Sequence, residues 1–199
     1  PVPAPEPIAP APVEPPPPEP RSDCALIQEP GESIATVGLT ERVDAVNALH
    51  PTNDSERLLF RQVYETLVRV DCEGRVAPAL AVSWRLDTDG RTWLLKLRDD
   101  ARFADGAPVS AADVKAGWTR DESVDELRLH VRRFAESVVA VSPTELAITL
   151  RGKPQDAPLA LAHPDLVIAR RVADSSWPVG TRPVRVTPDR DAVVVANPD

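Results

Sequence analysis

The chain has 199 residues and a formal net charge of −8 at pH 7, and 42% of its residues are hydrophobic but only 4% aromatic. This length suits one domain of ordinary size or parts of two. Acidic and basic residues are interspersed without a basic stripe, which argues against nucleic acid as a partner. No apolar run approaches the ~20 residues that span a bilayer. Because the chain begins with Pro1 and contains no methionine, we expect a mature form that has lost a targeting segment.

Proline dominates the first 20 residues, with eleven in PVPAPEPIAPAPVEPPPPEP. Proline fixes φ and lacks an N–H donor, so neither helix nor sheet is expected here. We predict an extended linker over residues 1–23 and a folded part over 24–199. A stalk is favoured over a ligand for a proline-binding module, because no recognition motif repeats.

Hydrophobic periodicity and turn residues predict the elements of the folded part. In chain order these are a strand over 32–39, a loop over 41–54, a helix over 55–70, a turn over 71–74, a hairpin over 82–98, a loop over 103–109, a helix over 110–120, a helix over 122–136, a hairpin over 138–150, a strand over 165–172, and a strand with a following loop over 192–199.

The predicted helices have identifiable starts and apolar faces. Ser55 or Asp54 caps the first helix, and Ser110 with Asp113 has the spacing of a capping box at the second. The apolar stripe of 55–70 consists of Leu58, Leu59, Val63 and Leu67. The stripe of 122–136 consists of Val124, Leu127, Val131 and Phe134.

Turn residues define the two predicted hairpins. The sequence Asp87-Thr88-Asp89-Gly90 separates two strand-like runs over 82–98, and Asp-Gly is a strong hairpin signal. Ser-Pro-Thr-Glu marks the turn of the shorter hairpin over 138–150. Such alternating runs joined by short turns predict neighbouring antiparallel strands.

No enzyme signature is found in the sequence. It contains neither a Gly-x-Ser-x-Gly motif nor a cysteine beside a general base. The histidines, His50, His130 and His163, lie in no HExxH motif, so we expect them to be exposed or locally hydrogen-bonded rather than metal ligands. We therefore expect no catalysis, no metal and no cofactor.

The Asp105-Gly106 pair lies in the stretch FADGAPVSAADVKAGW. Asp accepts backbone N–H bonds in tight turns, and Pro108 stiffens the exit. A structural turn is favoured over a direct role in binding a ligand.

The two cysteines, Cys24 and Cys72, match no zinc or redox spacing. Outside the cytosol they would form one disulfide that closes a long loop, whereas in the cytosol they would be two separate thiols. The sequence leaves both alternatives open.

Several motifs, in order, resemble the family 5 extracellular solute-binding proteins, the peptide- and nickel-type receptors of ABC importers. VYETLVRVD resembles the helix that ends in Tyr-Glu-x-Leu, and RVAPALAVSW the Pro-x-Leu-Ala-x-x-Trp segment. DTDGRTWLLKLRDDARFADGAPVSAADV is similar to the hairpin followed by Phe-x-Asp-Gly-x-Pro and Ala-x-Asp-Val. WPVGTRPVRV resembles the Gly-Thr-Gly-Pro-Tyr segment, with Arg182 and Val184 in place of Gly and Tyr, and NPD follows.

The resemblance implies the N-terminal lobe of a type II periplasmic-binding-protein-like fold, of the α/β (α+β) class, with a mixed sheet, hairpins and flanking helices. It implies an extracytoplasmic substrate-binding protein, with peptides as the favoured ligand and a membrane permease as partner. A periplasmic location suits the stalk, which would serve as a membrane anchor, and suits the disulfide. The family's length implies a natural chain that continues past Asp199, with a second lobe.

The loop before the first helix supplies the residues that we expect nearest the ligand cleft. These are Asn47, His50, Thr52 and Asn53, whose polar side chains suit a peptide backbone. A capped surface loop is the alternative for the same residues. An alternative function is a stalked single-lobe scaffold that has lost transport and docks onto an envelope partner protein.

Overall fold

The computed structural model describes residues 37–121, 126–152, 157–173, 175–188 and 192–196. The helical elements are α1 (Asp54–Val63), α2 (Ala111–Trp118) and α3 (Ala157–Ala160), with the 3-10 turns η1 (Ala45–Asn47), η3 (Val131–Arg133) and η5 (Pro164–Leu166). The strands are β1 (Val68–Val70), β2 (Val76–Pro78), β3 (Ala81–Leu86), β4 (Thr92–Leu97), β5 (Thr119–Asp121), β6 (Glu126–Leu127), β7 (Ala135–Ser142), β8 (Glu145–Leu150), β9 (Val184–Pro188) and β10 (Ala192–Ala196).

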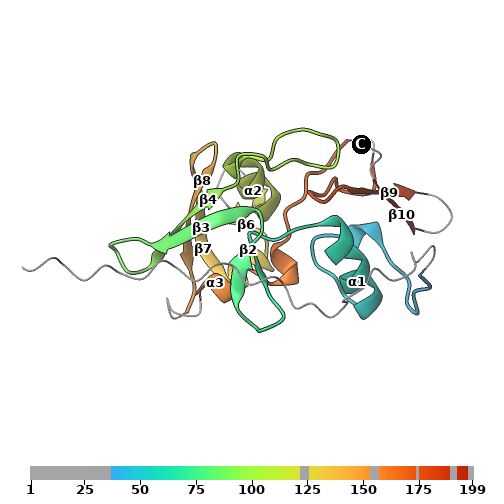
Figure 1. Ribbon diagram of the computed structural model, residues 1–199, viewed down its shortest axis with the longest axis horizontal. Helices are drawn as coiled ribbons and strands as arrows, with labels where there is room; N and C mark the ends of the chain where they lie inside the picture. The colour runs from blue at the N-terminus through green and yellow to red at the C-terminus, as the bar shows by residue number, and fades with distance from the viewer. Residues whose placement is uncertain (1–36, 122–125, 153–156, 174, 189–191, 197–199) are drawn as a thin grey trace, which may run out of the picture.

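A four-stranded sheet in the order β3-β4-β8-β7 organises the larger part of the fold, which we call the sheet part (Figure 1). Helix α2 packs against β7. Alternation along β4 directs Leu95 and Leu97 into the core, where they meet Leu146 and Ile148 of β8, while Lys96 is exposed. Every strand ladder in the described ranges is antiparallel.

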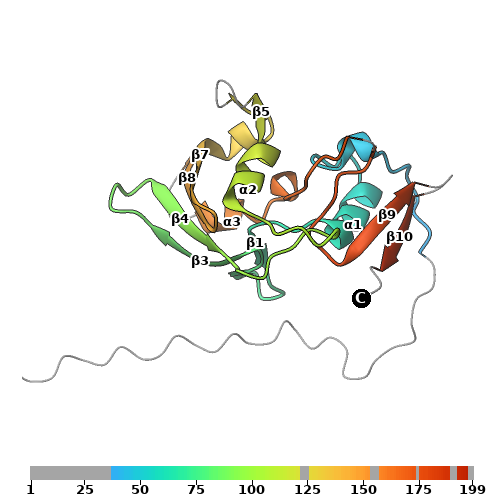
Figure 2. The same ribbon diagram turned by 90° about the horizontal axis from the view of Figure 1, so that it is seen from above.

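Helix α1, η1 and the β9–β10 hairpin form a second part, which we call the helix part and which lies beside the sheet part (Figure 2). It has a core of its own. Phe60 lies at its centre, with ring centroids 5.8 Å from Tyr64 and 6.2 Å from Trp177, both in edge contacts. These edge contacts join α1 to the segment that precedes β9.

Two segments, 63–68 and 166–169, connect the two parts. The amide of Ile168 donates to the carbonyl of Glu65 at 2.8 Å, which joins the two crossings. Side chains along the second crossing alternate between the two cores, Leu166 and Ile168 toward the sheet part and Val167 and Ala169 toward the helix part. A segment buried on both sides has a continuous apolar sequence, as in LVIA at 166–169.

Both predicted hairpins are confirmed, as β3–β4 and β7–β8. Gly90 adopts φ 68° at the first turn, and Asp89 accepts bonds from the amides of Arg91 and Thr92. The capping box is also confirmed: the Ser110 amide donates to the Asp113 carboxylate at 2.8 Å, and the Asp113 amide to Ser110 Oγ.

The first helix is shorter than predicted. Its N-cap is Asn53, neither Ser55 nor Asp54, and it ends at Val63 rather than at residue 70. Tyr64 has extended backbone (φ −115°, ψ 144°) because the chain there leaves the helix part and crosses to the sheet part.

The predicted stripe of this helix is correct for Leu59 and Val63, which are buried. Leu58 is 51% exposed, so its place in the stripe is wrong. Leu67 is buried, but in the core of the sheet part. Leu67 therefore keeps the helical spacing of apolar residues by chance, because the segment that contains it is not helical.

The helix predicted over 122–136 is wrong where the structure describes it, because β6, η3 and the start of β7 occupy residues 126–127, 131–133 and 135–136. Leu127 and Val131 are nevertheless buried, and Phe134 packs against the same core. A short strand and a 3-10 turn thus present apolar side chains at helix-like spacing. Val124 lies outside the described residues.

The remaining differences concern short strands. Residues 165–172 form no continuous strand but η5 and two single bridges, Ile168 to Glu65 and Arg170 to Val179. Residues 37–39 form no strand, and 32–36 lie outside the described residues. Helix α2 ends at Trp118 rather than Arg120, and the strand at 192–196 is confirmed as β10.

The predicted linker, residues 1–23, and Cys24 lie outside the described residues. The Cys24–Cys72 disulfide therefore stays a prediction. No helix in the described ranges is both long and apolar enough to cross a membrane.

Candidate functional site

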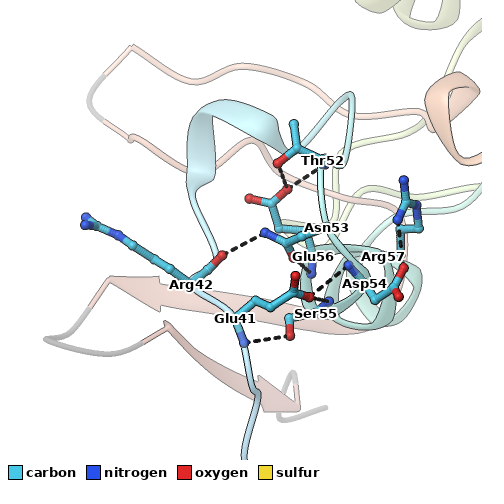
Figure 3. Close-up of polar contacts among 8 residues, drawn as sticks. All are labelled: Glu41, Arg42, Thr52, Asn53, Asp54, Ser55, Glu56 and Arg57. Atoms are coloured by element: carbon cyan, nitrogen blue, oxygen red, sulfur yellow. Dashed lines mark hydrogen bonds and ion pairs between the residues drawn. The ribbon is translucent and has the colours of Figure 1, made fainter.

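Three of the four residues predicted to approach a ligand bond to Glu56, two of them to its buried carboxylate and the third to its backbone amide. Glu56 is 1% exposed. Asn47 Nδ2 donates to its Oε1 at 2.8 Å, and the amide and hydroxyl of Thr52 donate to its Oε2 at 2.7 and 2.9 Å. Asn53 Oδ1 accepts from the Glu56 amide at 2.8 Å as the N-cap of α1, and its Nδ2 donates to the carbonyl of Arg42 (Figure 3). These polar groups hold the loop 44–53 in one conformation.

The Glu56 carboxylate is kept ionised by its hydrogen bonds. Burial alone would raise its pKa, but donors from Asn47, Thr52 and Asp44 hold the pKa below its ordinary value of 4.5. A buried carboxylate with such donors forms strong, directional hydrogen bonds.

The fourth predicted residue, His50, belongs to a different group of side chains. Its Nδ1 lies 3.0 Å from Asp165 Oδ1, and its ring stacks on that of His130 with centroids 5.4 Å apart and planes 12° apart. His163 Nδ1 accepts from the amide of Asp165 and lies 3.7 Å from Asp165 Oδ2. His50 and His163 thus contact one acidic residue, and His130 joins them through its stacking on His50. We call these four residues the histidine cluster.

The histidine cluster lies where the two parts meet. Leu49, next to His50, belongs to the core of the helix part, and Val131, next to His130, belongs to that of the sheet part. The Asp165 side chain is 8% exposed, whereas the side chains of His50 and His163 are 48% and 46% exposed. A buried acid thus sits beneath two solvent-accessible imidazoles.

Electrostatics favour a neutral His130. Burial lowers its pKa most, followed by the nearby imidazole of His50, and Arg128 and Arg133 act in the same direction. Asp165 opposes them. The stacking of the two rings is the contact through which His50 acts on the pKa of His130.

The turn at Asp105-Gly106 reaches from the sheet part to the helix part. Gly106 adopts φ 87°, and Asp105 Oδ1 accepts from the amide of Ala107. Asp105 Oδ2 forms an ion pair with Arg170, whose guanidinium lies 4.8 Å from the Phe103 ring centroid. These contacts fix the turn, so both residues hold the loop.

A cavity of about 180 Å³ adjoins this turn. Its lining is mainly apolar, from Val63, Trp177, Val184 and Val186, and Asp105 contributes a charged side chain. It lies beside the segment 175–180 and strand β9.

Within the described ranges, no group of three His, Cys, Asp or Glu residues is placed to hold a metal ion.

Sequence reasoning did not identify Glu56 or Asp165, nor the places of His130 and His163 in the histidine cluster. The spacing of Asn53 and Glu56 is that of a capping box, so local pattern indicated Glu56 but not its partners. The carboxylate reaches past the N-cap to Thr52, Asn47 and Asp44. The histidine cluster has no local signal, because it depends on how the two parts meet.

Comparison with known families gives a match over residues 75–199 to the bacterial extracellular solute-binding proteins, family 5 middle. The chain belongs to this family. The predicted relationship to family 5 is thereby confirmed.

Individual relatives of this family 5 chain differ in what they are named for. It is 36% identical over 130 residues to the nickel-binding periplasmic protein of Escherichia coli K12, a match that covers 62% of this chain and 25% of that protein. It is 30% identical over 145 residues to the glutathione-binding protein of the same strain, covering 67% and 28%. The chain thus spans about a quarter of the length of these curated relatives.

Solved structures confirm the predicted fold of this family 5 chain. The Escherichia coli murein tripeptide-binding protein superposes with a TM-score of 0.63 at 21% identity, covering 79% of this chain and 37% of that one. At this identity the likeness concerns the fold alone. The chain has the mixed helix-and-sheet architecture of type II periplasmic binding proteins, with antiparallel sheets.

Proposed function

We propose that this chain is part of an extracytoplasmic substrate-binding protein of an ABC importer, that it binds peptides, and that it delivers them to a membrane permease. Family membership supports the binding role. The relatives are named for nickel, glutathione and a murein tripeptide, so the choice among ligands has to be argued from the site.

The observation that carries the proposal is the histidine cluster. His50 and His163 are half-exposed over the buried Asp165, at the meeting point of the two parts. Imidazole nitrogens donate and accept hydrogen bonds, which suits the amides and terminal carboxylate of a peptide. We propose that His50 and His163 contact the ligand.

The other predicted residues, Asn47, Thr52 and Asn53, take part in the same proposal as the loop that presents His50. Their side chains bond to Glu56 and to backbone groups, which supports a role in shaping the site. No catalytic step is proposed. The described His, Cys, Asp and Glu residues form no metal-binding group of three, which supports testing peptide before nickel.

We further propose that residues 1–23 act as a stalk outside the cytoplasmic membrane. Their proline content supports an extended spacer, and the nickel-binding relative in Escherichia coli is periplasmic by name. The Cys24–Cys72 disulfide suits the same location.

Titration calorimetry on the full chain tests the ligand, with a tripeptide, glutathione and nickel chloride as separate titrants. We expect saturable binding of the tripeptide, weakened about tenfold by His50→Gln through loss of a charge-assisted hydrogen bond. Arg85→Gln, an exposed change on β3, is the matched control and should leave the affinity unchanged.

Each other outcome has a defined meaning. Binding of only glutathione or only nickel would replace the peptide as ligand. Absence of heat with all three titrants would contradict the binding role and favour the single-lobe scaffold that docks onto an envelope protein.

A further inference from the structure

The inference concerns Glu56, a buried carboxylate that belongs to α1 but whose side-chain partners all lie in the preceding loop. We propose that Glu56 is a positioning residue that fixes the loop 44–52 so that His50 lies against Asp165 and His130. This rests on the proposed function, because it assigns Glu56 a part in shaping the histidine cluster.

The four donors to Glu56 come from both sides of His50. Before it, the Asp44 amide and Asn47 Nδ2 donate to Oε1 at 3.1 and 2.8 Å. After it, the amide and hydroxyl of Thr52 donate to Oε2 at 2.7 and 2.9 Å. Each carboxylate oxygen therefore holds one side of the turn that carries His50.

The helix part fixes Glu56 itself. Asn53 Oδ1 accepts from its amide, which places the residue in the first turn of α1, and Phe60 one turn later is buried at the centre of the core. Ala48 and Leu49, immediately before His50, are buried in the same core. The backbone around His50 is thus held by apolar burial below and by the carboxylate on both sides.

The opposite half of the cluster belongs to other elements. His130 precedes η3, and Asp165 lies in η5, neither of which contacts Glu56 through a hydrogen bond in the described residues. A shift of the loop therefore moves His50 relative to two fixed partners. It changes the His50–Asp165 distance of 3.0 Å and the His50–His130 stacking distance of 5.4 Å, on which the charges of the cluster depend.

Glu41 provides a matched control on the same helix end. Its carboxylate accepts from the amides of Asp54 and Ser55 at 3.1 and 3.2 Å, and its own amide donates to Ser55 Oγ (Figure 3). Glu41 thus supports the start of α1 as Glu56 does, but it makes no hydrogen bond to the loop around His50. Glu41→Gln tests a loss of helix support, and Glu56→Gln tests a loss of loop positioning.

The experiment is an NMR titration of the three histidine rings in the ligand-free full chain. In Glu56→Gln an amide NH₂ replaces one oxygen and faces donors, so we expect the loop to move and the His50 ring to leave its place against His130. Because the His50 imidazole lowers the pKa of His130, we expect the titration midpoint of His130 to rise. In Glu41→Gln we expect the His130 midpoint to stay at its wild-type value. If Glu56 had a merely structural role, both variants would be less stable than wild type, but their histidine titrations would not differ.

Identical histidine titrations in wild type and Glu56→Gln would overturn the proposal. If Glu56→Gln does not fold, Asn47→Ala removes one donor to Oε1 and should raise the His130 midpoint by a smaller amount. An unchanged His130 midpoint in that variant would overturn the proposal. Tripeptide affinity, expected to fall about tenfold in Glu56→Gln, is read separately. If wild type binds no tripeptide, the proposed function fails, while the titration still decides the role of Glu56.

Discussion

His50 Nδ1 lies 3.0 Å from Asp165 Oδ1, although α1, α2 and the whole four-stranded sheet lie between the two residues in the sequence. This contact forms only when the helix part and the sheet part are in place. The other two histidines of the chain adjoin this pair: His130 stacks on His50, and His163 lies beside Asp165. The cluster therefore reports on the junction between the two parts as well as on the proposed ligand.

Acidification should weaken the fold through His130. Its pKa in the folded chain lies below the ordinary value of 6.5, so below about pH 6.5 the unfolded chain takes up a proton that the folded chain does not. We expect the free energy of unfolding to fall between pH 7 and pH 5, measured by urea denaturation.

His130→Phe keeps a ring to stack on His50 but cannot titrate. The variant should show a flatter dependence of stability on pH over the same range. An unchanged slope would assign the effect to another group.

Gly180→Ala should be strongly destabilising. A Cβ at this position would lie 2.0 Å from the carbonyl oxygen of Val63 and 2.8 Å from the ring of Tyr64, so the segment before β9 would have to move away from α1. We expect a loss of about 3 kcal/mol or an unfolded product, read from thermal and urea unfolding. Gly38→Ala, whose Cβ would meet nothing within 4 Å, is the control, and comparable losses in both would refute this account.

The capping box at α2 should contribute measurably to stability. Ser110→Ala removes the acceptor for the Asp113 amide and should cost about 1 kcal/mol in urea unfolding. Ser83→Ala, an exposed change in β3, should stay within about 0.5 kcal/mol of wild type. Equal stability of Ser110→Ala and wild type would mean that water replaces the cap at no cost.

The disulfide proposed between Cys24 and Cys72 is tested by intact mass. The non-reduced chain should be lighter than the reduced chain by two hydrogens, and reduction should destabilise it by about 4 kcal/mol, since the bond closes a long loop. Two alkylatable thiols in the protein isolated under oxidising conditions would contradict the pairing.

Local pattern predicted the hairpins and the capping box because their determinants are neighbours in sequence. Gly90 supplies the positive φ of one turn, and Ser110 and Asp113 bond to each other. Pattern failed at residues 64–70, where Leu67 keeps helical spacing but is buried in the other core. No periodicity distinguishes a helix from a chain that crosses between two cores.

The candidate site likewise contains residues that the local sequence indicated and residues that only tertiary packing brings together. The loop residues Asn47, Thr52 and Asn53 were identified by their polarity and their place before a helix, and the structure brings them together around Glu56. Asp165 could not be found, since its contact with His50 depends on the packing of η5 between the two parts.

The most direct test of the central claim is to add a tripeptide to the full chain and follow the ring signals of the three histidines by NMR. Binding at the histidine cluster predicts saturable shifts of His50 and His163, with the same dissociation constant as calorimetry gives. Signals that stay fixed at saturating tripeptide would contradict the proposed site, and the absence of binding by both methods would contradict the proposed function.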